Sequence, residues 1–310
     1  MRAIAEFRVY EEFAHLLFAD DEGERLGDSV RKVTLDTSDP RYQRIGELQK
    51  SLRRKGKSFF CGWSLKYQYR SAELRAAPLL HLKITSSFRP TGEERGTKYD
   101  EAAACPICGA GAPQITTLFV REERIPKTRD FCQSWGGEII VSRRIKDLFE
   151  NHSITGARFD TVVPKKRSNV ESSDWFQFFP ENATAEIVPP TRTGETLFDE
   201  GVDAAAKRDT SWMDKVPPGL RQGILEMFER MEEEIYHCPF GDAVGLNLLS
   251  EIFIKESTKP DLDIVATRQF IGCRRGLFRQ KRLLLISPRL YRLLAAEKIK
   301  GIKVDVAHLM

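Results

Sequence analysis

The clearest chemical signal in the chain is a pair of cysteines two residues apart. Cys105 and Cys108 belong to the run Cys-Pro-Ile-Cys-Gly at 105–109, and such a turn is how a zinc knuckle presents two thiolates to one tetrahedral metal ion. A structural zinc site takes four ligands, yet the sequence has no second Cys-x-x-Cys. The remaining ligands are therefore open, and the candidates that could complete the site are Cys61, Cys132, His237 and Cys238.

Three interpretations of this pair remain open. It can be half of a zinc site, a metal-free remnant of a duplicated knuckle, or a redox-active dithiol. No thioredoxin-like strand precedes the motif, which speaks against the dithiol. At the matching place later in the chain stands Cys238-Pro239-Phe240-Gly241, where the second thiol is missing.

No complete catalytic motif occurs elsewhere in the sequence. The histidines form no HExxH or Hx(3–5)H arrangement and are better explained as structural residues; they are His15, His81, His152, His237 and His308. Cys61 or Cys132 as a nucleophile would need a positioned base, which no sequence spacing supplies. Gly272 and Gly276 lack the Gly-Lys-Ser/Thr ending of a phosphate-binding loop. We therefore expect a protein that is not an enzyme.

Positive charge is concentrated near the end of the chain. Eleven Lys and Arg against one acid give the segment 268–303 a charge of +10, which leaves 4 − 10 = −6 for the rest. Arg274, Arg275 and Arg279 alternate with aromatic residues there, a mixture typical of protein-binding hot spots. These three arginines are the predicted partner-binding residues. The same mixture could bind nucleic acid or be a solvated surface.

Two stretches of the chain, 105–156 and 238–301, share landmarks in the same order. Each begins with Cys-Pro and continues through an aromatic residue, a proline, an Asp-apolar pair, an apolar run ending in serine, and a glycine. The matched positions are Cys105 and Cys238, Phe119 and Phe253, Pro126 and Pro260, Asp130 and Asp263, Ser142 and Ser287, and Gly156 and Gly301. So many matches in one order predict an internal duplication, with the copies packed about a pseudo-twofold axis.

Each copy has the pattern of a strand, a helix and a second strand. The apolar runs ending at Ser142 and Ser287 are typical of buried strands, and both serines are suited to cap the helix that follows. Pro288 fits the first helical position of the second copy. Alternating residues at 154–163 and 299–306 then predict the closing strands.

Around these features the chain resembles a known family. The run Thr97-Lys98-Tyr99-Asp100 followed by Cys-Pro-Ile-Cys-Gly, with the duplicated Cys-Pro element, is similar to the bacterial double-CXXCG motif proteins. The resemblance covers roughly 96–306, and the second motif departs from the family pattern at 238–241. Those proteins are known from myxobacterial paralogues, some associated with toxin immunity. The resemblance thus implies an immunity-like protein that binds and neutralises a partner protein such as a toxin.

Composition and local patterns predict an α+β fold in four parts. The chain has 310 residues, 41% hydrophobic and 30% charged, which excludes collagen-like, coiled-coil and largely disordered proteins. The parts are an N-terminal α+β domain (1–95), a first repeat (96–164), a connecting segment (165–236) and a basic second repeat (237–310). The expected strands are 4–9, 58–69, 79–88 and 175–179, and the expected helices are 11–18, 41–54 and 220–236.

The cysteines and the lack of long apolar runs bear on location. No run approaches the roughly 18 residues that a membrane span needs, and the first residues lack a secretory pattern. Six cysteines in such a chain indicate reduced thiols. We expect a cytoplasmic bacterial protein without a membrane partner.

Overall fold

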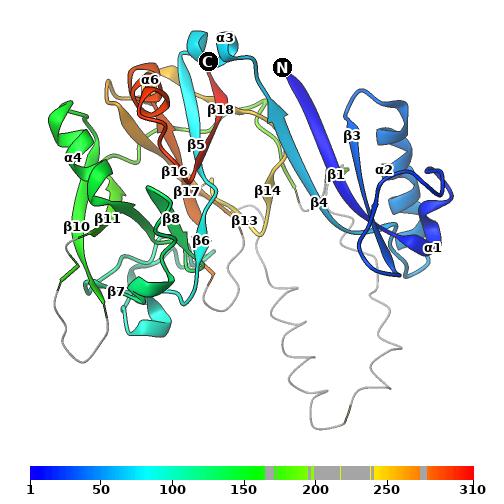
Figure 1. The fold of residues 1–310 in the computed structure, drawn as a ribbon, viewed down its shortest axis with the longest axis horizontal. Helices are drawn as coiled ribbons and strands as arrows, with labels where there is room; N and C mark the ends of the chain where they lie inside the picture. Colours follow the sequence, from blue (N-terminus) through cyan, green and yellow to red (C-terminus); the bar gives the residue numbers. More distant parts are fainter. Residues whose placement is uncertain are drawn as a thin grey trace. The chain divides into compact units, whose positions relative to one another are not determined.

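The computed structural model divides the chain into two units, each with helices and strands, which confirms the α+β class (Figure 1). Unit 1 comprises Met1–Arg70 with Gly194–Glu233, and unit 2 comprises Ser71–Thr193 with Glu234–Met310. The residues that the structure describes are 1–164, 171–172, 174–194, 197–198, 217, 238, 241–272 and 278–310. The helix expected at 220–236 lies outside them.

Unit 1 is built on a four-stranded antiparallel sheet in the order β2-β3-β1-β4. The strands are β1 (Arg2–Tyr10), β2 (Glu24–Arg25), β3 (Val30–Asp36) and β4 (Phe60–Gln68), and the helices are α1 (Glu11–Ala14) and α2 (Pro40–Arg53). Ala5, Phe7 and Val9 alternate along β1 and are fully buried, as the period of two predicts. Asp39 caps α2 by accepting a hydrogen bond from the Arg41 amide at 2.9 Å. The predicted strand at 4–9 and helix at 41–54 are confirmed.

Unit 2 contains two six-stranded sheets that have the same plan. The first has the order β6 (Ser87–Phe88), β8 (Phe131–Ser134), β9 (Ile139–Ser142), β11 (Trp175–Pro180), β10 (Ala157–Pro164), β7 (Leu118–Val120). The second has the order β13 (Ala243–Val244), β16 (Ile264–Gly272), β17 (Lys281–Ile286), β5 (Leu79–Ile84), β18 (Ile302–Leu309), β15 (Ile252–Ile254). In both sheets the two edge strands run parallel to their neighbours and the inner pairs are antiparallel.

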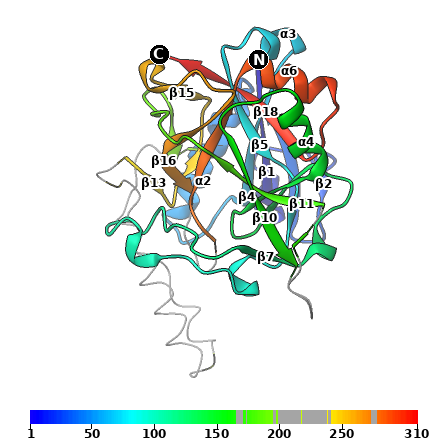
Figure 2. The ribbon, with the colours of Figure 1, turned by 90° about the vertical axis from the view of Figure 1, so that its left-hand side faces the viewer.

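Short elements connect these strands. Among the described residues of unit 2, the α-helices are α3 (Ser71–Ala76), α4 (Arg143–Asn151) and α6 (Pro288–Ala296). The 3-10 helices are η1 (Glu93–Arg95), η2 (Glu101–Ala103), η3 (Glu122–Arg124) and η5 (Glu256–Thr258), and the remaining strands are β12 (Thr193–Gly194) and β14 (Asn247–Leu248). In Figure 2, α4 and α6 lie near each other, in agreement with the hydrogen bond from Arg144 to the Glu297 carbonyl at 2.6 Å.

One strand of each sheet comes from an unexpected part of the chain. β5 precedes the first copy but lies between β17 and β18 of the second sheet, whereas β11 lies between β9 and β10 of the first. The chain then crosses to the opposite sheet in both cases: β6 pairs in parallel with β8, and Ala185 forms a parallel bridge to Thr267 of β16. The strand expected at 79–88 is thus broken in two, and it belongs to unit 2 rather than to the N-terminal unit.

Contacts between the copies are reciprocal. The Phe131 amide donates to the Lys300 carbonyl, and the Ile264 amide donates to the Thr155 carbonyl, both at 3.1 Å. A Cβ on Gly156 or Gly301 would lie 2.1 Å from the carbonyl oxygen of Ile264 or Phe131 respectively. Both glycines also have positive φ, so only glycine fits these crossings. The matching strand arrangement of the two sheets and these paired contacts are what an internal duplication would produce. The duplication itself stays a prediction.

One of the hydrophobic cores of unit 2 contains residues from both sheets. It contains the buried residues Leu80, Leu82, Phe131, Val141, Ile145, Phe149, Phe176, Phe178, Ile264, Leu284, Ile286, Leu290 and Leu294. The predicted aromatic strand at 175–179 is confirmed as β11, and its Trp175, Phe176 and Phe178 are buried.

The two predicted helix caps differ. The Ser287 hydroxyl accepts from the Leu290 amide at 3.0 Å and caps α6. Ser142 occupies the same place before α4 but makes no capping hydrogen bond, so that prediction was wrong. Its hydroxyl donates to Asp130 at 3.3 Å, just as the Ser287 hydroxyl donates to Asp263 at 2.7 Å, so the two serines share this contact and differ only in the cap.

Candidate metal centre

The first half of the site is the turn predicted from Cys-Pro-Ile-Cys-Gly. The Cys105 amide donates to the Ala110 carbonyl and the Gly109 amide donates to the Cys105 carbonyl, both at 2.8 Å. Gly109 has a φ of 66°, a left-handed conformation that closes the turn at little cost for glycine. The closed turn places the Cys105 and Cys108 side chains in one cluster.

The second half is a shorter turn of the same kind. The Cys238 amide donates to the Asp242 carbonyl at 3.0 Å, and the Gly241 amide donates to the Cys238 carbonyl at 2.8 Å. Gly241 has a φ of 93° and corresponds to Gly109. The residue after this glycine is Ala110 in the first turn and Asp242 in the second. The second turn is one residue shorter, lacks the second cysteine, and has a carboxylate directly after its glycine.

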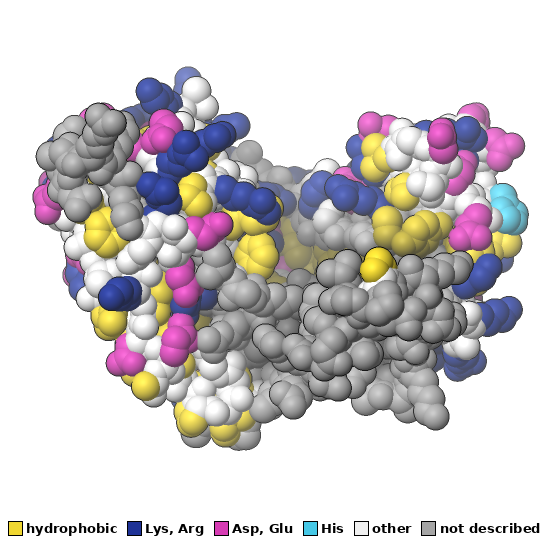
Figure 3. All heavy atoms as spheres, turned by 90° about the horizontal axis from the view of Figure 1, so that it is seen from below, with side chains coloured by type: hydrophobic (Ala, Val, Ile, Leu, Met, Phe, Trp, Pro, Cys, Tyr) yellow, Lys and Arg dark blue, Asp and Glu magenta, His cyan; other side chains and the backbone are white. Residues whose placement is uncertain are grey.

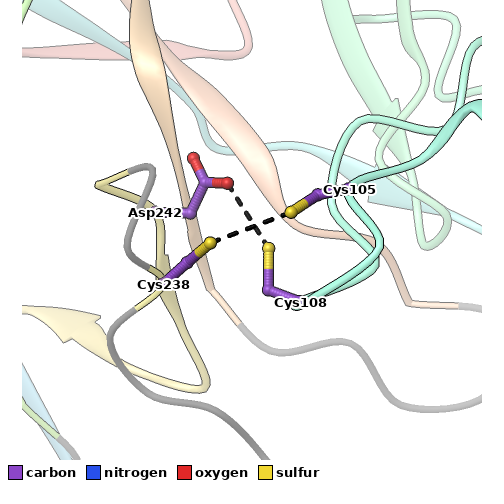
Figure 4. A group of neighbouring side chains, drawn as sticks. All are labelled: Cys105, Cys108, Cys238 and Asp242. Carbon is purple, nitrogen blue, oxygen red and sulfur yellow. Dashed lines mark hydrogen bonds between the residues drawn. The ribbon is translucent and has the colours of Figure 1, made fainter.

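The two turns bring four ligand atoms together (Figure 4). One sulfur or oxygen atom from each of Cys105, Cys108, Cys238 and Asp242 lies within 4.8 Å of all the others. The Cys105 and Cys238 sulfurs are 3.8 Å apart, and Cys108 Sγ is 3.4 Å from Asp242 Oδ2. A tetrahedral zinc ion about 2.3 Å from sulfur and about 2.0 Å from oxygen would separate such pairs by about 3.8 and 3.5 Å. The cluster can therefore hold a metal ion.

Backbone groups fix the orientation of the carboxylate. Asp242 Oδ1 accepts a hydrogen bond from the Phe270 amide of β16 at 2.9 Å, so Oδ2 is the atom that faces Cys108. Orienting partners of this kind are typical of metal ligands. Cys238 and Asp242 are 5% and 8% exposed, while the first-turn cysteines are half-buried. The site is thus closed on the side of the second sheet.

The two cysteines of the first turn differ in acidity. The pKa of Cys105 is lowered, chiefly because the Cys108 amide donates a hydrogen bond to its sulfur. Burial raises the pKa of Cys108. A bound cation would favour the thiolate form of both, since metal binding displaces protons from thiols.

The structure separates the candidate ligands proposed from the sequence. Cys238 joins the pair, whereas Cys61 belongs to unit 1, where its sulfur lies 3.5 Å from the Arg8 carbonyl. Cys132 is buried in the first sheet, 3.8 Å from Ser86 Oγ. His237 lies outside the described residues. Sequence reasoning missed Asp242, although its place directly after the glycine of the second turn was a usable signal.

The basic segment is partly neutralised within the chain. Arg274 and Arg275 lie outside the described residues. Arg279 pairs with Glu93 at 3.1 Å and with Glu101 at 2.6 Å, and its guanidinium lies 3.9 Å from the centre of the Tyr99 ring. Carboxylates also pair with Arg268, Arg289 and Lys303.

Comparison with known proteins adds no family to these observations. No family model matches the chain, and no curated protein is significantly similar to it. The likeness to double-CXXCG proteins therefore stands on the quoted motifs alone. Within the described part of the chain, no helix has the length and apolar character that crossing a bilayer requires.

Proposed function

We propose that Cys105, Cys108, Cys238 and Asp242 bind one structural zinc ion in a non-catalytic binding protein. The observation that carries the proposal is the set of ligand distances, 3.8 Å between two sulfurs and 3.4 Å between sulfur and oxygen. Thiolates favour zinc over magnesium, calcium and manganese. Four protein ligands leave no open position for a substrate or water, which is the pattern of structural rather than catalytic zinc.

The proposed ion has a clear mechanical role. Two of its ligands come from the first turn and two from the second. Cys105 and Cys238, one from each turn, are 133 residues apart in the sequence. The second turn lies against β16 through the hydrogen bond between Asp242 and Phe270. Zinc would therefore tie the first copy to the second sheet and fix the loops between them.

Metal analysis of the purified chain tests this role. We expect about one zinc per chain, lost in the double variant Cys105→Ser, Cys108→Ser and retained in Cys61→Ser, whose thiol belongs to unit 1 and contacts the Arg8 carbonyl. Removal of zinc with a chelator should lower the unfolding temperature of the wild type. A chain that is fully folded without metal and equally stable with it would contradict the proposal.

For the protein as a whole we propose the binding of a partner protein, as an immunity-like neutraliser in the bacterial cytoplasm. The resemblance at 97–109 and the closed ligand set support this function. The alternative, a nucleic-acid module, loses support from the ion pairs of Arg279 and Arg289, which leave less free charge for phosphates. Purification of the tagged chain from its native lysate, with nuclease treatment and a high-salt wash, tests both. One stoichiometric protein supports neutralisation, and partners lost with nuclease support the alternative.

A further inference from the structure

An exposed pair of aromatic rings lies on unit 2, away from the four metal ligands in sequence. Trp135 is 39% exposed and Phe278 is 45% exposed. Their ring centres are 5.6 Å apart with the planes inclined by 30°, and the Arg89 guanidinium lies 3.0 Å from the centre of the Trp135 ring. With Lys281, these residues form what we call the aromatic–basic surface.

Regular backbone structure holds this surface in place. Trp135 follows β8, and its amide donates to the Phe88 carbonyl at 3.2 Å, just before Arg89. The chain turns back at Gly137, which has a φ of 101°. Lys281 begins β17 and donates to Gln133 of β8 at 3.1 Å. Both sheets of unit 2 therefore contribute to one surface.

The two cations of this surface have no acidic partner among the residues that the structure describes. No carboxylate among the described residues lies within 4.0 Å of the side-chain nitrogens of Arg89 or Lys281. Of the acids close in sequence to Arg89 and Trp135, Glu93 pairs with Arg279, and the buried Glu138 accepts a hydrogen bond from Tyr99 at 2.7 Å. The surface thus combines exposed apolar rings with uncompensated positive charge. Figure 3, an unlabelled view from below, shows that Lys and Arg side chains lie beside hydrophobic ones at several places on that face.

We infer that the aromatic–basic surface docks an acidic segment of the partner protein. This inference rests on the proposed binding function and names its contact. Carboxylates of the segment would pair with Arg89 and Lys281, while an apolar side chain would cover the exposed parts of Trp135 and Phe278. Trp and Arg dominate protein-binding hot spots, and complementary charge selects the partner. A nucleic acid fits less well, because the Arg89 guanidinium already covers a ring face of Trp135 that a base would stack on.

Selection from a displayed library of random peptides on the immobilised full chain tests the inference. We expect enriched peptides that combine Asp or Glu with a large apolar residue. Their affinity should fall about tenfold or more in Arg89→Glu, Lys281→Glu and in Trp135→Ala. The matched control is Arg292→Glu, Lys298→Glu, two exposed cations elsewhere on the unit, which should leave binding unchanged. Unaltered zinc content and unfolding temperature establish that each variant is folded.

The other outcomes separate this inference from the proposed function. The docking surface would be overturned if the enriched peptides lack acidic residues, if no peptide is enriched, or if the peptides bind all variants equally. Tight binding of a labelled 20-nucleotide single strand, lost in Arg89→Glu, Lys281→Glu, would assign the surface to nucleic acid instead. If the lysate partner binds every variant equally, the binding function stands and this surface is not its contact. If no partner protein is found, the function itself fails.

Discussion

Replacing Asp242 by Asn separates the role of this residue as a ligand from its role in packing. The amide oxygen of Asn can still accept the hydrogen bond that the Phe270 amide now donates to Oδ1 at 2.9 Å. The atom that faces Cys108, now 3.4 Å from its sulfur, becomes an uncharged and much poorer ligand. Removing one charged partner from a buried ion pair costs about 3–5 kcal/mol. Zinc affinity should therefore fall by about two to three and a half powers of ten.

Two measurements on the same samples check this expectation. Competition with a chromophoric chelator gives the zinc affinity, and urea unfolding with and without chelator gives the stability that the metal contributes. The metal-free Asp242→Asn chain should be as stable as the metal-free wild type, because the shape and the Phe270 hydrogen bond are kept. Asp261→Asn is the control, since this aspartate is exposed. Wild-type zinc affinity in Asp242→Asn would refute the four-ligand assignment.

Three further predictions concern stability. Gly156→Ala should lower the free energy of unfolding, measured in urea, by more than about 3 kcal/mol, because the new Cβ would lie 2.1 Å from a carbonyl oxygen. Gly27→Ala, where the new Cβ meets open space, should lower it by only about 1–2 kcal/mol through backbone strain. Equal losses in the two variants would contradict the crowding at Gly156. Ser287→Ala should lose about 1 kcal/mol and Ser142→Ala less, since only Ser287 caps its helix; a larger loss for Ser142→Ala would reverse the assignment of the caps. Burial lowers the pKa of His81 to about 3, so below pH 6.5 the unfolded chain takes up a proton that the native chain does not. The free energy of unfolding should then fall by up to about 1.4 kcal/mol for each pH unit below 6.5. His81→Gln should remove this pH dependence in urea titrations at pH 7 and pH 5. If the variant keeps the same pH dependence as the wild type, His81 titrates normally in the native chain.

Local sequence patterns predicted the elements well. The alternation in β1 and the apolar faces of α4 and α6 follow directly from periodicity, because β1 buries one face in unit 1 and the two helices bury theirs in the core of unit 2. The pairing of Cys105 with Cys238 was within reach, since the turns resemble each other. The only sequence signal for the fourth ligand, Asp242, is its place directly after the glycine of the second turn, because a single aspartate has no ligand spacing of its own.

Long-range pairing could not be predicted from these patterns. The sequence at 79–84 predicts a strand, but nothing in its residues shows that its neighbours in the sheet are β17 and β18. The basic segment likewise has a clear charge pattern, while the acids that neutralise Arg279 lie at positions 93 and 101, far away in sequence. Such contacts depend on the path of the chain, which short-range periodicity does not contain.

The place of β5 in the second sheet has a consequence for synthesis on the ribosome. Leu82 of β5 pairs with Leu284 and Val304, and 304 − 82 = 222 residues must be added before the second partner exists. At about 5–20 residues per second, that strand waits roughly 10–45 s with its edges unpaired. Cys105 and Cys108 wait in the same way for Cys238 and Asp242. Unit 2 therefore cannot complete its fold until β18 has been synthesised, and until then the edges of β5 are open to pairing with other strands.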